Sequence, residues 1–138
     1  MPSLLRPALL AAAMAFTCTG CAQVEAHSCR EGERAAVEDT LVFGTAKPGG
    51  TVTREEWERF LREAVTPRFP EGFTQWDASG QWRSADGSVV REASHVLAVV
   101  HPAEPQAEAN VRAIAAEYKS RFGQEAVLRT RSEACVSF

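Results

Sequence analysis

Two stretches of the chain carry apolar residues at helical spacing. In the first, a capping box of Thr53 and Glu56 precedes five apolar residues at intervals of three and four: Trp57, Phe60, Leu61, Ala64 and Val65. We predict a helix here that stops at Pro67. The second stretch begins near Pro105 and ends before Gly123, with its apolar face formed by Val111, Ile114, Ala115, Tyr118 and Phe122. We predict a second helix from Pro105 to Phe122.

The remaining apolar runs are typical of strands. Residues 37–44 contain the apolar run Leu41-Val42-Phe43 and end at a glycine, which predicts the first strand. From Phe73 to His101 the composition favours two strands joined at Asp86-Gly87, with Ser79-Gly80 as a bulge or turn. Residues 96–100 are apolar at every position, which indicates a central strand. A last strand is expected at residues 125–130.

The resulting order of elements is β-α-β-β-α-β. This order predicts an α+β, ferredoxin-like sandwich, in which a four-stranded antiparallel sheet carries two helices on one face. We assign residues 37–138 to this single domain and residues 21–36 to a tether.

The first 20 residues resemble a bacterial secretory signal. Arg6 precedes an apolar run of about half the roughly 20 residues that a spanning helix needs. Thr19-Gly20-Cys21 is similar to a lipobox, which predicts lipidation of Cys21 and a membrane anchor, although Cys18 stands where an aliphatic residue is usual. The alternative is ordinary cleavage, for instance after Ala22, which would release a soluble protein. Both readings place the protein outside the cytoplasm, at the cell envelope or secreted.

Two cysteines remain in the mature chain beyond Cys21. In an oxidising compartment Cys29 and Cys135 are expected to pair, closing a loop of about 105 residues. The alternative is two free thiols. No cysteine or histidine spacing is typical of zinc, so we expect no metal.

The net charge and the motifs of the sequence limit which ligands and cofactors we expect. Removing Arg6 from the 15 basic and 18 acidic side chains leaves 14 against 18, a net charge of −4. These charges are interspersed, which argues against nucleic acid. Nucleophile elbows, zinc-protease motifs and dinucleotide or phosphate loops are missing from the sequence, so we expect no cofactor.

One cluster of polar residues is a candidate ligand site on the hairpin. It consists of Trp82, Arg83, Arg91, Glu92 and His95. Arginines beside an aromatic ring can hold a carboxylate or phosphate, and histidine or glutamate can move a proton. The structural alternative is an Arg–Glu cross-strand pair with an aromatic residue on a sheet face.

Two further sets of residues have a functional and a structural interpretation. Arg68, in a connector stiffened by two prolines, either faces a ligand or only fixes the exit from the first helix. Tyr118 and His101 are either an acid–base pair or, for Tyr118, a core residue with a satisfied hydroxyl.

Several stretches resemble the bacterial domain-of-unknown-function family 3574, a group of small exported proteins. They are Leu41–Gly44, Thr66–Gly72, Gly80–Arg83, Arg91–Leu97, Tyr118–Glu125 and Ala134–Phe138. The resemblance implies an exported single domain, gives Cys135 positional importance and implies Lys as often as His at position 95. It implies no activity.

Two functions follow as hypotheses, and whether the protein is an enzyme stays open. The first is an anchored envelope protein that binds a partner or ligand, with the free sheet face as a docking surface or homodimer interface. The second is a small enzyme of the dimeric α+β-barrel kind, monooxygenase- or isomerase-like, with a pocket between sheet and helices. That pocket requires an enclosed cavity lined by Arg83 or Arg91 with His95 or Glu92.

Overall fold

A computed structural model describes residues 28–138. The expected signal peptide, residues 1–20, and the expected lipidation site, Cys21, lie outside these residues. The elements in chain order are β1 (Arg34–Gly44), β2 (Ala46–Lys47), β3 (Gly50–Thr51), α1 (Arg54–Phe60) with a π-helical turn (Leu61–Val65), β4 (Thr74–Arg83), β5 (Val89–His101), α2 (Pro105–Phe122) and β6 (Leu128–Val136). None of the described helices is long and apolar enough to cross a membrane.

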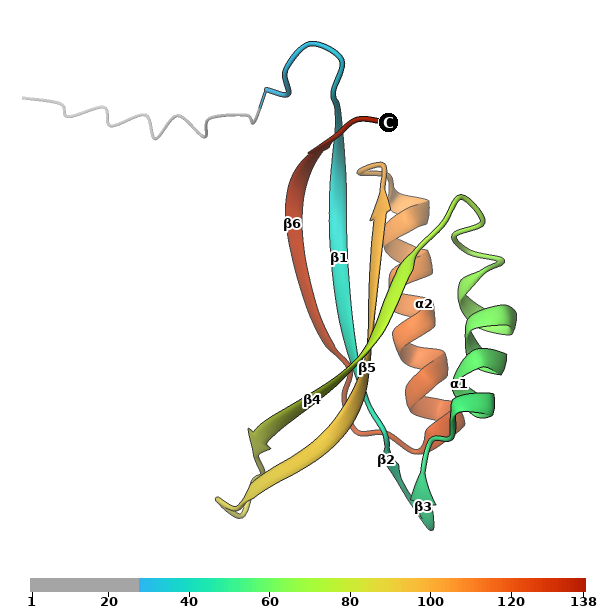
Figure 1. The fold of residues 1–138 in the computed structure, drawn as a ribbon, viewed down its shortest axis with the longest axis vertical. Coiled ribbons are helices and arrows are strands. Elements are labelled where there is room, and N and C mark those ends of the chain that lie inside the picture. Colours follow the sequence, from blue (N-terminus) through green and yellow to red (C-terminus); the bar gives the residue numbers. More distant parts are fainter. Residues whose placement is uncertain (1–27) are drawn as a thin grey trace, which may run out of the picture.

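Four strands form one antiparallel sheet in the order β4-β5-β1-β6. Both helices lie on the same face of this sheet (Figure 1). The predicted ferredoxin-like α+β fold is therefore confirmed. The all-apolar run at residues 96–100 belongs to β5, which is an inner strand as expected, because it pairs with β4 on one side and β1 on the other.

The predicted helix ends are confirmed by their caps. The Thr53 hydroxyl accepts a hydrogen bond from the Glu56 backbone amide, and the Glu56 carboxylate accepts one from the Thr53 backbone amide. The last turn of the first helix widens, with the Thr66 amide donating to Leu61 O at 2.9 Å. α2 is capped at its C-terminus by Gly123, whose φ of 65° lies in the left-handed region.

Three strand boundaries differ from the sequence prediction. β1 begins at Arg34, so the sheet takes in three residues assigned to the tether. β6 starts at Leu128 instead of residue 125 and continues to Val136, because it pairs with β1 along its whole length. Gly80 makes no bulge or turn: β4 runs straight through it, opposite Glu92.

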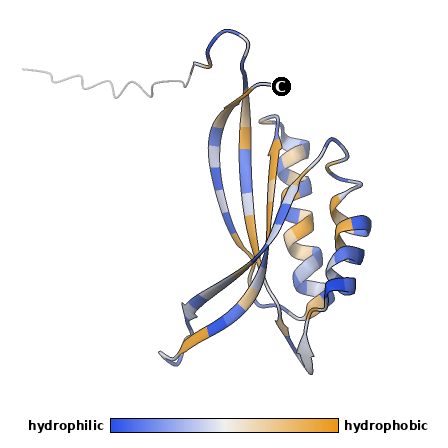
Figure 2. Ribbon diagram, in the orientation of Figure 1, coloured by the Kyte–Doolittle hydropathy of each residue, from blue (hydrophilic) through white to orange (hydrophobic). Residues whose placement is uncertain are grey.

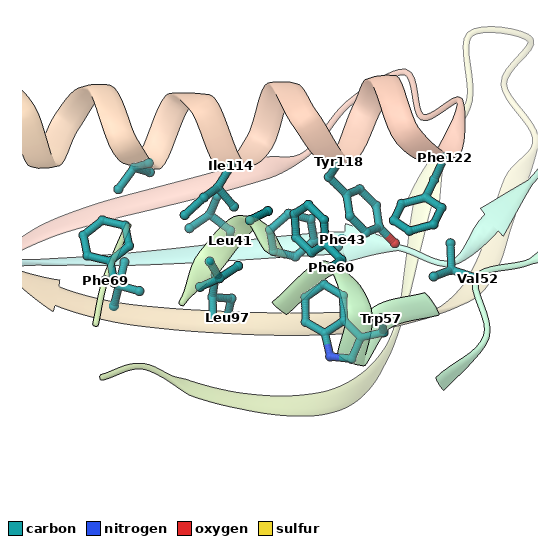
Figure 3. Close-up of a cluster of buried hydrophobic side chains, with 14 residues drawn as sticks. Leu41, Phe43, Val52, Trp57, Phe60, Phe69, Leu97, Ile114, Tyr118 and Phe122 are labelled. Atoms are coloured by element: carbon teal, nitrogen blue, oxygen red, sulfur yellow. The ribbon is translucent and has the colours of Figure 1, made fainter. Parts of the chain in front are cut away.

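The core lies between the helices and the sheet. Its largest members include Leu41, Phe43, Trp57, Phe60, Leu97, Ile114, Tyr118 and Phe122 (Figure 3). Phe43 sits at the centre of the aromatic contacts, with ring centroids 4.6 Å from Tyr118 and 5.3 Å from Trp57. These side chains fill the space between the two layers.

A disulfide joins Cys29 to Cys135, as expected, across 106 residues of sequence. Ala35 pairs with Cys135 in the sheet, so the bond fastens the chain just before β1 to the end of β6. It thereby ties together two segments from opposite ends of the described chain.

Candidate functional site on the open face of the sheet

The strand register sorts side chains between the two faces of the sheet by the parity of their residue numbers. Val42 pairs with both Val96 and Leu128, and Val96 pairs with Trp76. Odd-numbered strand residues such as Leu41 and Phe43 lie under the helices, and successive side chains alternate. Even-numbered residues therefore occupy the opposite face, which no described helix covers (Figure 1). We call it the open face.

The open face is apolar, although a water-facing antiparallel sheet normally carries polar residues there. Among the even-numbered strand residues only Arg34, Glu38 and Glu92 are charged. The face carries four large hydrophobic side chains that are 45–62% exposed: Trp76, Trp82, Val100 and Leu128. Figure 2 shows hydrophobic residues along β5 in orange.

Beyond the body of the sheet, β4 and β5 continue as a two-stranded arm. β1 ends at Gly44, opposite Ser94, whereas β4 and β5 pair on as far as Arg83 and Val89. We call residues 79–93 the arm; it points away from the helices (Figure 1). Residues 84–88 connect the two strands, with the turn at Asp86-Gly87 as predicted and Gly87 at a φ of 87°.

Two of the candidate residues meet on the open face of the arm. The Trp82 indole donates a hydrogen bond to Glu92 Oε1 at 3.2 Å. Glu92 also lies against Gly44, where an added Cβ would come within 2.9 Å of Glu92 Oε1. Both tryptophan and carboxylate reach this face because their residue numbers are even.

Arg83 and Arg91 lie on the other side of the arm. Arg91 Nε donates to Gln81 Oε1 at 3.2 Å, and Arg83 donates to Gly87 O at 3.1 Å. Neither arginine forms an ion pair with Glu92. The candidate residues of the hairpin therefore lie on two different faces. They do not form a single anion-binding site.

His95 packs against the first helix. Its ring is stacked on Trp57, with centroids 4.5 Å apart and planes 9° apart. Its Nδ1 lies 2.8 Å from Asp77 Oδ1, and Asp77 also accepts from Arg54 at 3.3 Å. The buried Nε2 atom has no hydrogen-bond partner among the described residues. This arrangement holds the ring flat against the core.

Arg68 links the end of the first helix to α2 through its side-chain contacts. Its guanidinium donates to Ala64 O at 2.6 Å and forms an ion pair with Glu117 at 3.1 Å. Asn110 donates to the Arg68 backbone oxygen at 3.2 Å. These contacts hold the connector after the first helix against α2, on the opposite face of the sheet from Trp82.

A buried charged network lies under the start of α2. Asp39 is completely buried in β1 and accepts two hydrogen bonds from Arg129, both at 2.7 Å. His101 Nε2 lies 2.8 Å from the same carboxylate. Arg129 also donates to Glu108 at 2.6 and 2.9 Å, and Arg131 donates to Glu108 at 2.8 Å. The network fastens β6, β1, β5 and α2 together.

The network sets the charges of its carboxylates. Burial raises the pKa of Asp39, but the hydrogen bonds from Arg129 and His101 outweigh burial, so the pKa lies below its ordinary value. The hydrogen bond from Arg129 lowers the pKa of Glu108 to about 2. Both groups are therefore ionised at neutral pH, as two acceptors of arginine hydrogen bonds should be.

Tyr118 is a core residue. Its hydroxyl donates to Gly44 O at 2.8 Å, and burial, with the nearby Glu92 charge, raises its pKa. His101 belongs to the Asp39 network, so the two residues do not form the acid–base pair considered above.

Two surface cavities lie apart from the candidate residues. One, of about 680 Å³, is bordered by residues such as Lys47, Arg59 and Arg121; the other, of about 590 Å³, is bordered by residues such as Ala36 and Cys135. Neither is lined by Arg83, Arg91, Glu92 or His95. The only described group with metal-ligand geometry, Cys29, Glu33 and Cys135, has both sulfurs in the disulfide.

The sequence matches one family model over residues 38–138, described as "Protein of unknown function (DUF3574)". The chain belongs to this family. A comparison with curated proteins finds no match.

The fold of this DUF3574 member is similar to that of a phage SAM lyase. The structure of that lyase in complex with S-methyl-5'-thioadenosine has 14% identity and a TM-score of 0.56, covering 81% of this chain and 95% of the lyase. Its apo structure has 15% identity and a TM-score of 0.55, covering 82% and 96%. At this identity the likeness establishes a shared fold.

Proposed function

We propose that this DUF3574 protein is an exported envelope protein, anchored through a lipid on Cys21, that binds another protein through its open face. The observation that carries the proposal is the apolar open face, with four half-exposed large side chains and three charged residues. Contiguous apolar surface on a soluble domain marks an interaction site. Tryptophan is also enriched among the few residues of an interface that contribute most of its binding energy.

The packing on the helix side supports a binding role over an enzymatic one. The barrel-enzyme hypothesis requires an enclosed pocket between sheet and helices. Leu41, Phe43, Leu97 and Tyr118 fill that space and are completely buried. The surface left for a partner is the broad face of the sheet and its arm, a shape that suits a protein more than a small molecule.

Photo-cross-linking in cells tests the proposal. A photoreactive amino acid replaces Val100, on the open face, in the full chain with its own leader. We expect a covalent adduct to a protein, and an acyl mass on Cys21 in the recovered material. The matched control carries the same amino acid at the exposed Glu58 of α1 and should give no adduct. Equal yields at both positions, or none at Val100, would contradict the binding role, and an unmodified Cys21 would contradict the anchor.

A further inference from the structure

We propose that the protein bound by the open face is a second copy of this chain, with the two sheets packed face to face. The inference rests on the proposed function and names its partner. Three observations support it: the unsupported arm, the area of the face and the distribution of its few charges.

The arm lacks the third strand and the helix that stabilise the rest of the sheet. As strands, residues 79–83 and 89–93 pair only with each other, and at the base of the arm Ala93 O accepts two hydrogen bonds from Thr45, at 2.8 and 3.1 Å. A two-stranded hairpin is at best marginally stable in water unless another surface packs against it. Trp82 lies on the open side of this arm and is 48% exposed. A second sheet laid on the open face would cover the arm and its tryptophan together.

The area of the open face matches what a stable dimer needs. Four strands about 4.8 Å apart, with about ten residues of 3.3 Å each, cover roughly 600 Å² in projection. Side chains make the accessible area of such a surface larger than its projection. Stable interfaces bury about 800 Å² on each partner. Most of the open face would therefore be buried by one copy.

Two of the three charges, Arg34 and Glu92, favour an antiparallel, twofold arrangement. Arg34 lies at the start of β1, and Glu92 lies beyond the other end of that strand, next to Gly44. When two copies face each other with their strands reversed, Arg34 of one copy lies toward the Glu92 end of the second copy. A twofold axis repeats this pairing at both ends, as in most homodimers.

A membrane surface is a poorer occupant of the same face. Faces that lie on lipid combine apolar residues with lysine and arginine, which attract anionic headgroups. The open face has one arginine, at its edge, and two glutamates.

Sedimentation of the lipid-anchored full chain in density-matched detergent tests this inference. We expect two copies per particle and dissociation on dilution. Trp82→Ala should weaken association at least about tenfold, because a half-exposed tryptophan buried on association is among the residues that contribute most to binding energy. Val89→Ala is the matched control, since Val89 is 53% exposed on the opposite side of the same arm. It should leave association unchanged, and circular dichroism should show both variants folded.

Three outcomes would overturn the inference. A monomer at all concentrations, alongside a Val100 adduct to a different protein, would refute self-association and leave the binding role standing. A monomer without any Val100 adduct would refute both. Quenching of Trp82 fluorescence by brominated lipid in reconstituted vesicles would show that the face lies on the bilayer instead.

Discussion

Replacing both Cys29 and Cys135 with serine should lower the free energy of unfolding by about 4–5 kcal/mol. The bond closes a loop of 106 residues, and a loop of this length restricts the unfolded chain by about that amount in the chain-entropy model. Small domains have a net stability of about 5–15 kcal/mol, so the loss removes a large part of it. Urea denaturation of oxidised wild type and of the double variant measures the difference.

The same experiment contains its own control. Wild type in the presence of reductant should unfold at the urea concentration of the double variant, because both lack the same bond. Each single serine variant should also unfold at the urea concentration of the double variant. A loss below about 1 kcal/mol would show that the sheet holds both ends of the chain without the disulfide.

Arg129→Met should destabilise the domain by about 3 kcal/mol. The substitution keeps the aliphatic bulk but leaves the fully buried Asp39 carboxylate without its bidentate partner. Breaking a buried pair by removing one member costs about 3–5 kcal/mol, and Arg129 is only 22% exposed. Arg131→Met, two residues along the same strand, is the matched control. Its one ion pair, with Glu108, is at the surface, so a cost below about 1 kcal/mol is expected.

Acid titration gives the Arg129 variant a second readout. The folded-state pKa values of Asp39 and Glu108 are lowered from 3.8 and 4.5, in the case of Glu108 to about 2. Their contribution to stability is therefore present above the unfolded pKa and is lost as the pH falls from about 4.5 towards 2. Wild type should lose stability across this window, and Arg129→Met should lose less. Equal acid dependence in the two proteins would show that Arg129 does not set these pKa values.

The helices could be predicted from sequence because their signals are local. A capping box, a proline and a glycine mark their ends within one turn of the residues they govern. The ends of β6 could not be predicted in this way, since the strand carries charged and small polar residues and is defined by its pairing with β1. The start of β1 at Arg34 likewise depends on pairing, since Arg34 lies opposite Val136 of β6.

The candidate residues illustrate the same limit. A hairpin centred on Asp86 pairs residues whose numbers sum to 172, which would have brought Asp77 to His95 and Val90 to Trp82. The Asp86-Gly87 turn can be predicted from sequence, but the contacts between its strands follow only once their register is known. Asp39, in contrast, contacts His101 and Arg129, which lie 62 and 90 residues away in the sequence. No local sequence pattern predicts these contacts.

The apolar character of the open face could be predicted only in part from the sequence. From sequence alone, the unbroken apolar run at residues 96–100 indicates an inner strand of the sheet. Trp76, Val42 and Leu128 share the parity of Val96, but that relation depends on the register of four strands. Once the register is known, the same run shows that the outer face of the sheet is apolar too.

Hydroxyl-radical footprinting of the three tryptophans tests most directly whether the open face is covered in the native protein. Trp57 is only 3% exposed and serves as the internal reference, whereas Trp76 and Trp82 are 45% and 48% exposed in a single copy. In concentrated full chain, Trp76 and Trp82 should oxidise nearly as slowly as Trp57, and dilution should restore their reactivity. Rapid oxidation of Trp76 and Trp82 at every concentration would contradict the account.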